Sequence, residues 1–250
     1  MKTLTFPAFL TMLYLVTIPE GAHAQPATPP PPPGWVASAS AGLALTSGNS
    51  DTSTVNAAYE LKRDTGGVIV LKSNGLLVYG KSQDVLTNDR LALDGRVERK
   101  LSTRTSLFGQ TQYLRDSFKA IDYLVSPTIG LTRMLVKDDR TELGVDAAVG
   151  VVWEQNPGLE LQTDGAVTAG QQFARKLTAT TELKEKAAAL WKMDDFGDAL
   201  YQFGIGVAAS ITAATQMKVE FLDTYKAKPP LSTVKKNDIA VLVSFVYKLE

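Results

Sequence analysis

The chain ends in the stretch DIAVLVSFVYKLE (Asp238 to Glu250), which has the alternating pattern of a long β-strand. Successive side chains of a strand point to opposite faces, so every second residue shares a face. The apolar face consists of Ile239, Val241, Val243, Phe245, Tyr247 and Leu249. The opposite face includes Ser244 and Lys248. An apolar strand with an aromatic pair at the chain terminus is typical of the closing strand of a transmembrane β-barrel, although a soluble sandwich can end in the same way.

Similar alternating segments fill the rest of the chain, and turn residues separate them. Leu143 to Trp153 places its apolar residues on one face, with Asp146 and Glu154 on the other. Repetition of this kind indicates an all-β fold, a transmembrane antiparallel up-and-down β-barrel of about 12 strands, with lipid outside and a polar lumen. The expected strands are residues 35–46, 53–63, 67–79, 89–100, 104–115, 121–134, 140–153, 164–175, 176–190, 199–211, 215–227 and 238–249.

One of these segments is compatible with two structures. Residues 178–190 include the run Glu182 to Ala189, whose composition also has good helix propensity. A helix at this place would remove one strand from the predicted barrel.

The connections and the aromatic residues indicate how such a barrel is oriented. Connections such as 63–66 and 137–139 are short, whereas 81–88, 154–164 and 228–237 are longer. Barrels have short periplasmic turns and longer extracellular loops, so an even strand count places both termini on the periplasmic side. Aromatic rings favour the two membrane interfaces. We expect Tyr79, Tyr113, Tyr123, Trp153, Trp191, Tyr201 and Tyr225 at the loop ends of their strands, and Trp35, Phe173, Phe245 and Tyr247 at the turn ends.

The N-terminal region predicts export and then a spacer. Lys2 precedes an apolar stretch over residues 6–18, and Ala22-His23-Ala24 has the pattern of a cleavage site, so residues 1–24 are expected to be a signal peptide. The apolar stretch is shorter than the roughly 20 residues that a spanning helix needs. Residues 25–34 form a Pro-rich tether, which should be extended in water. Residues 35–250 form the predicted outer-membrane barrel.

The residue types that are missing restrict the chemistry. The chain has no Cys, and its one His is His23, in the expected signal peptide. Catalysis by Ser-His or Cys-His pairs and His-ligated metal sites therefore require residues that the mature chain lacks. The remaining acidic groups at 138–139, 194–195 and Asp198 are interpreted as solvated loop charges, with at most loose affinity for divalent cations. We predict no enzyme activity, no catalytic residues, no cofactor and no metal site.

The chain resembles a family known as the salt-induced outer membrane proteins (YdiY-like), a domain of unknown function. The resemblance covers about Trp35 to Leu249 and rests on Gly34-Trp35, on GLALTSGNSDT over residues 42–52, and on Lys236-Asn237-Asp238 before the final Tyr247-Lys248-Leu249. Members usually stop at an aromatic residue after the Tyr-Lys pair, whereas this chain continues with Leu249 and Glu250. The resemblance implies an outer-membrane barrel and supplies no catalytic residues.

The most specific part of that resemblance also has a structural explanation. Gly48, Asn49 and Ser50 suit a tight hairpin turn, because Gly and Asn tolerate the left-handed backbone that such turns require. A role in ligand binding is the alternative.

Charged residues of both signs occupy the polar face of the expected strands. Inward charges of both signs can pair across a lumen, which avoids burial of a charge without a partner. A pore built for one ion sign would have a lining of the other sign. We therefore expect a tight, partly plugged interior. The lumen-facing candidates are Glu60, Lys62, Lys72, Asp94, Arg96, Glu98, Lys100, Asp146, Glu182, Lys184, Lys218 and Glu220.

These observations predict a non-enzymatic outer-membrane β-barrel that is either a narrow porin-like channel or a structural envelope protein. The alternatives are a barrel whose loops, above all residues 228–237, bind a ligand or lipopolysaccharide, and a soluble periplasmic β-sandwich. The expected location is the cell outer membrane after cleavage near Ala24. The expected partners are outer-membrane lipid, lipopolysaccharide and the barrel assembly machinery, whose C-terminal recognition signal the last strand resembles. With a net charge of zero, the chain has no electrostatic footprint for nucleic acid.

Overall fold

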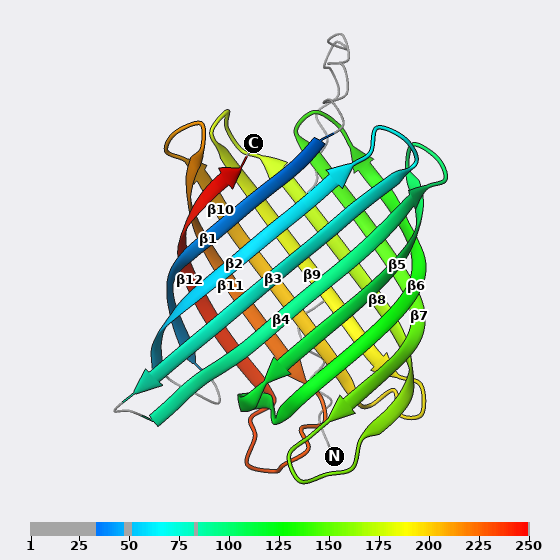
Figure 1. Ribbon diagram of the computed structural model, residues 1–250, viewed down its shortest axis with the longest axis vertical. Helices are drawn as coiled ribbons and strands as arrows, with labels where there is room; N and C mark the ends of the chain where they lie inside the picture. The colour runs from blue at the N-terminus through cyan, green and yellow to red at the C-terminus, as the bar shows by residue number, and fades with distance from the viewer. Residues whose placement is uncertain (1–33, 48–51, 83–84, 250) are drawn as a thin grey trace, which may run out of the picture. The chain divides into compact units, whose positions relative to one another are not determined.

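Twelve antiparallel strands form a closed barrel in the computed structural model, which describes residues 34–47, 52–82 and 85–249 (Figure 1). A short 3-10 helix, η1 (Ser117–Lys119), lies between the fifth and sixth strands. Within this part of the chain, none of the helical segments has the length and hydrophobicity of a transmembrane helix. The strands are β1 (Gly34–Ser47), β2 (Thr52–Asp64), β3 (Ile69–Ser82), β4 (Val85–Lys100), β5 (Thr105–Asp116), β6 (Ile121–Lys137), β7 (Thr141–Gln155), β8 (Gln162–Lys176), β9 (Thr181–Lys192), β10 (Ala199–Ser210), β11 (Thr215–Lys226) and β12 (Asn237–Leu249).

The predicted all-β barrel of 12 strands is confirmed, and each observed strand coincides with one expected strand over most of its length. Residues 181–192 form β9, so the helix considered for 178–190 does not form. Cross-strand pairing on both sides outweighs the helix propensity of this segment. The soluble sandwich is wrong, because the sheet closes on itself instead of forming two packed sheets. Residues 1–33 and the turn at 48–50 lie outside the described residues.

The C-terminal strand closes the barrel, as its apolar pattern predicted. β12 pairs with β1 from Ala37 opposite Leu249 to Ser47 opposite Ile239. The two strands approach very closely at Gly42, where a Cβ atom would lie 1.9 Å from the carbonyl oxygen of Val243. Glycine is the residue that allows such an approach between backbones.

The register gives the barrel a consistent inside and outside. Even-numbered residues pair with even-numbered residues around the ring, apart from the ends of strands beyond the bulges that follow Gly80, Leu114 and Met134. Arg90 on β4 contacts Thr224 on β11, on a distant part of the ring, so the even-numbered face is the inner one. On the odd-numbered face, Ile129 is 56% exposed, and other large apolar residues are exposed in the same way. An apolar outer surface of this kind suits lipid.

The two ends of the barrel differ in the length of their connections. Residues 65–68, 101–104, 138–140, 177–180 and 211–214 are short turns at the end where β1 begins and β12 ends, which we call the turn end (top of Figure 1). The opposite loop end carries residues 117–120, 156–161, 193–198 and 227–236. Aromatic rings gather at the loop end, where Trp191 donates a hydrogen bond of 3.1 Å to the Tyr201 hydroxyl and Tyr201 lies 6.0 Å from Tyr225.

Candidate functional site

The inner face of the barrel is arranged in layers along the barrel axis. An apolar layer lies toward the loop end, and a layer of buried charges lies immediately beyond it. The rest of the interior, toward the turn end, is lined by polar and charged side chains; we call it the turn-end interior.

The apolar layer draws side chains from every strand between β3 and β12, with Ala92 as the contribution of β4. One group packs around Val152, which has no exposed surface, and a second packs around Leu242, which is 2% exposed. Polar neighbours at the next inward position of the same strands, such as Glu154 beside Val152, leave the apolar layer only a few residues deep. Its members are Leu114, Ile121, Leu124, Val152, Ala166, Leu190 and Leu200 in one group, and Val78 and Leu242 with Leu76, Leu222 and Ala240 in the other.

The charged layer at the loop end is centred on Glu154. Its Oε1 accepts hydrogen bonds from Lys226 Nζ at 2.6 Å and from Asn156 Nδ2 at 3.0 Å, and its Oε2 lies 3.0 Å from Lys192 Nζ. Lys192 Nζ also lies 2.8 Å from Asp198 Oδ2. The side chains of Glu154, Lys192 and Lys226 are almost completely buried. Each charge in this layer therefore depends on its partners, because an isolated buried charge is costly.

A second contact at the loop end joins connections on opposite sides of the ring. Lys119, in η1 between β5 and β6, has no exposed surface and donates to the backbone carbonyls of Lys235 and Lys236, at 3.2 and 2.8 Å. Its Nζ also lies 3.2 Å from Asp238 Oδ2. Burial lowers the pKa of Lys119, although the Asp238 carboxylate acts in the opposite direction. The loop between β5 and β6 is thus held against the loop between β11 and β12.

The local sequence explains how η1 presents this lysine. Asp116 caps the turn, because its Oδ1 accepts the backbone N–H groups of Phe118 and Lys119, both at 3.1 Å. Ala120 then ends the turn in the left-handed conformation, with a φ of 51°. Short polar side chains before a helix start commonly act in this way, but nothing in the sequence pattern shows that the lysine reaches across the barrel.

The turn-end interior contains a charged network centred on Arg96. Its Nε donates to Glu98 Oε1 at 2.6 Å, and its guanidinium lies over the Phe108 ring, 3.4 Å from the centroid. Lys72 donates to the same Glu98 oxygen at 2.9 Å. Asp94 accepts hydrogen bonds from Asn74 and Gln110. Positive and negative groups on β3, β4 and β5 therefore compensate each other.

The other lumen-facing candidates lie on the same inner face. Lys218 pairs with Glu220 at 2.8 Å, and Lys184 lies 3.5 Å from Glu182. Lys100 pairs with Asp64 at 2.7 Å, near the turn end. Asp146 has no ion pair among the described residues. The predicted turn motif, Gly48, Asn49 and Ser50, lies outside the part of the chain that the structure describes. The structure thus brings most of these candidates together as local pairs between neighbouring positions.

The charged layer at the loop end was not predicted from the sequence. Glu154 was placed on the polar face of its segment but at the start of a loop, and Lys192 was placed in the connection after residues 176–190. Their even numbers continue the inward faces of β7 and β9. The interpretation of Asp198 as a solvated charge is wrong, because its carboxylate contacts the buried Lys192. Asp195 is exposed, and its hydrogen bonds from Lys228 and from the N–H of Gly197 lower its pKa. In the described chain, no group of three or more acidic or His side chains is placed to hold a metal ion.

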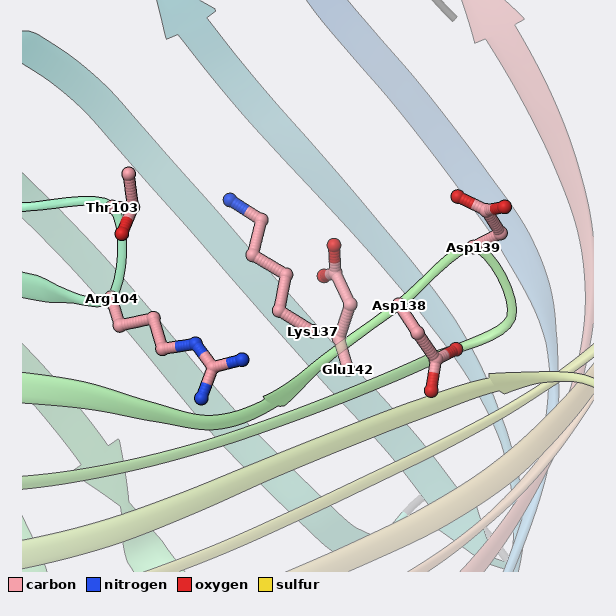
Figure 2. Close-up of a pocket in the computed structure, with 6 residues that line it drawn as sticks. All are labelled: Thr103, Arg104, Lys137, Asp138, Asp139 and Glu142. Atoms are coloured by element: carbon pink, nitrogen blue, oxygen red, sulfur yellow. The ribbon is translucent and has the colours of Figure 1, made fainter. Parts of the chain in front are cut away.

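A hollow of about 380 Å³ lies at the turn end (Figure 2). It is lined by residues of the β4–β5 and β6–β7 turns, among them Arg104, Lys137 and Glu142. The Asp138 carboxylate accepts the backbone N–H groups of Arg140 and Thr141, at 2.8 and 2.6 Å, which lowers its pKa. This carboxylate therefore stabilises its own turn. The other charged side chains that line the hollow are of both signs and do not point toward a common centre (Figure 2).

With this geometry established, comparison with known proteins gives the family. The sequence model of the family described as "Protein of unknown function, DUF481" matches residues 39–249. The chain belongs to the DUF481 family. This agrees with the resemblance noted from the sequence. Among curated proteins, none matches the chain at a significant level.

Solved structures show that the DUF481 barrel shares its fold with outer-membrane porins and channels. The porin NanC is 8% identical, with a TM-score of 0.57, and the match covers 84% of this chain and 100% of NanC. The COG4313 outer membrane channel from Pseudomonas putida F1 is 13% identical, with a TM-score of 0.51, and the match covers 90% of this chain and 100% of the channel. At these identities the likeness establishes a porin-like barrel fold and leaves the solute open.

Proposed function

We propose that this DUF481 barrel spans the outer membrane as a non-enzymatic, narrow porin-like channel whose passage is closed near the loop end in the conformation described. The observation that carries the proposal is the pair of layers across the interior. The apolar layer opposes the passage of ions, because apolar constrictions exclude water. The charged layer beyond it holds the closed arrangement with buried ion pairs.

The outer face supports insertion in a membrane. Odd-numbered residues such as Val207, Val219 and Val243 are apolar and exposed on adjoining strands. The N-terminal pattern supports export, with cleavage near Ala24 before the Pro-rich residues 25–34. Outer-membrane lipid, lipopolysaccharide and the assembly machinery are the proposed partners, because a barrel with this outer face requires them for insertion. No cofactor enters the proposal.

Two measurements test this function. The refolded mature chain should migrate differently on gels before and after boiling, which distinguishes a barrel from a soluble protein. In planar lipid bilayers it should show small, infrequent conductance steps with weak ion preference, because the inner charges are of both signs. Complete absence of steps over a wide voltage range would instead support a structural envelope protein. A large, continuously open and strongly selective conductance would contradict the proposal.

Binding of lipopolysaccharide by the β11–β12 loop is a second candidate function. Lys119 fixes this loop through the backbone carbonyls of Lys235 and Lys236, and the side chains of both lysines are exposed. Exposed ammonium groups on a backbone segment that is held in place at the loop end suit phosphate groups of the outer leaflet. Substitution of both lysines by Gln should weaken binding of lipopolysaccharide to the detergent-solubilised barrel and leave bilayer conductance unchanged.

A further inference from the structure

Two opposite charges on neighbouring parts of the turn-end interior do not take part in the local ion pairs of the inner face. Asp146 on β7 and Lys186 on β9 have no ion-pair partner among the described residues. By contrast, Glu98 binds Lys72 and Arg96, and Glu220 binds Lys218. Other inner charges, among them Glu60 and Lys62 on β2 and Asp94 on β4, also have no ion pair among the described residues, although Asp94 accepts hydrogen bonds from Asn74 and Gln110. On the wall formed by β7 to β9, the Asp146 carboxylate and the Lys186 ammonium group are therefore available to a ligand.

The register places the two groups on the same part of the inner wall. Asp146 pairs with Gly170 on β8, and Gly170 pairs with Ala188 on β9, one inward position from Lys186. Both Asp146 carboxylate oxygens lie 2.9 Å from the point that a Cβ atom on Gly170 would occupy, so the carboxylate leans over β8 toward β9. Because Gly170 lacks a side chain, nothing on β8 separates the carboxylate from the space in front of β9.

Lys186 also has room around it. Its partner on β10 is Gly204, and its partner on β8 is Gln172. The lysine is exposed to solvent although it points inward, which shows that water reaches this part of the interior. β7 and β9 are two strand spacings apart, roughly 10 Å. A small molecule can therefore lie along the wall between the two charges, with the Gln172 amide beside it.

We propose that Asp146 and Lys186 form a binding site for a small zwitterionic solute that enters the turn-end interior. The anionic group of the solute contacts the Lys186 ammonium group, and its cationic group contacts the Asp146 carboxylate. A molecule with both charges satisfies both residues at once, whereas a simple anion or cation satisfies one. This inference rests on the proposed barrel function, because it requires an interior open to the aqueous phase at the turn end.

The neighbouring charges favour a zwitterion over an ion of one sign. On the wall formed by β3 to β5, Arg96 and Lys72 pair with Glu98, and Asp94 accepts hydrogen bonds from Asn74 and Gln110. These four charged groups carry no net charge. On β9, Lys184 lies beside Glu182. The surroundings are thus close to electrically balanced, so that a ligand with no net charge adds no unpaired charge to the interior.

Ligand-observed NMR on the full mature barrel in detergent tests the site with three probes. These are β-alanine as the zwitterion, with propionate and propylammonium as its single-charge counterparts, at equal ionic strength. β-Alanine should bind, and Lys186→Met and Asp146→Asn should each weaken it at least about tenfold, as expected for the loss of a charge-assisted contact. Lys184→Met is the matched control on the same strand and face, and it should leave β-alanine binding within about twofold.

A charge exchange keeps the test decisive where a single variant folds poorly. Asp146→Lys combined with Lys186→Asp should restore binding, because the site then holds the zwitterion in the reverse orientation. The inference is overturned where no probe binds, where propionate or propylammonium binds as well as β-alanine, or where the Lys184 control loses binding to the same extent. Gel mobility and bilayer conductance of the same preparations show whether the proposed barrel function itself fails. A preparation that behaves as a barrel in both measurements but binds no probe contradicts only the binding site.

Discussion

Lys226 on β11 and Glu154 on β7 form an ion pair of 2.6 Å inside the barrel, although three strands lie between them in the sheet. Lys192 on β9 contacts the other oxygen of the same carboxylate. A contact across the interior constrains the distance between walls that hydrogen bonding in the sheet alone leaves independent. This carboxylate therefore fixes the shape of the loop end.

Glu154→Gln should destabilise the barrel by about 3 kcal/mol, because it leaves two buried lysines without their common anion. The measurement is guanidinium-induced unfolding in detergent, followed by tryptophan fluorescence and gel mobility. Glu160→Gln, at an exposed position of the β7–β8 loop, is the control and should change stability little. Equal effects of the two substitutions on the free energy of unfolding would show that the ion pairs of Glu154 do not stabilise the barrel.

The apolar layer should control conductance. Leu190→Ser together with Leu242→Ser places hydroxyl groups in the layer and favours water in it, so conductance steps should become larger and more frequent. Ala188→Ser, at the next inward position of β9, serves as the control and should leave conductance unchanged. An unchanged conductance in the double variant would place the barrier elsewhere.

A cationic side chain on the outer face should impair assembly of the barrel. Val207→Arg or Val243→Arg should reduce assembly, because a cation in the middle of the lipid-facing band costs roughly 2–4 kcal/mol. Ala208→Arg is the inward control, and its neighbours Glu182 and Lys218 show that charge is tolerated there. Ser244 is unsuitable as a control, because it is buried and donates a hydrogen bond to Asn56. Equal assembly of outward and inward variants would argue against a membrane environment.

Epitope tags should report the orientation. A tag inserted at residues 158–160 should be accessible to antibody on intact cells, and a tag at residues 138–140 should be accessible only after the outer membrane is permeabilised. The first insertion point avoids Asn156, which is buried in the charged layer. The opposite result would reverse the assignment of the turn end to the periplasm.

The β6–β7 turn should become less stable in acid. The pKa of Asp138 lies below its ordinary value of 3.8, because the carboxylate accepts two backbone N–H groups. Its contribution to stability is complete above the unfolded-state pKa and is lost as the pH falls through the lower folded-state pKa. NMR titration should therefore give a midpoint below 3.8 for Asp138. Asp138→Asn should remove this acid dependence of the turn, and a midpoint at or above the ordinary value would contradict the prediction.

The amino-acid sequence by itself determined all the strands except the one at residues 178–190, where it also allowed a helix, and it determined the face that most strand residues occupy. The reason is local: a period of two along each strand separates an apolar face from a polar one, as in Leu143 to Trp153. Closure of the barrel was also predictable. An apolar C-terminal strand in lipid needs a partner for the backbone N–H and C=O groups along its edge, and the first strand can supply them. The even numbers of Asp94, Arg96 and Glu98 already assigned them to a single face.

Only the tertiary structure decided which residues on that face meet. Glu154, Lys192 and Lys226 come from three strands, and Lys119 and Asp238 come from opposite sides of the ring. Alternation specifies a face but carries no information about contacts across the lumen, which depend on the register of every strand between the two residues. The layers, the buried Lys119 and the free Asp146 and Lys186 therefore follow from the closed ring and from no single segment of the chain.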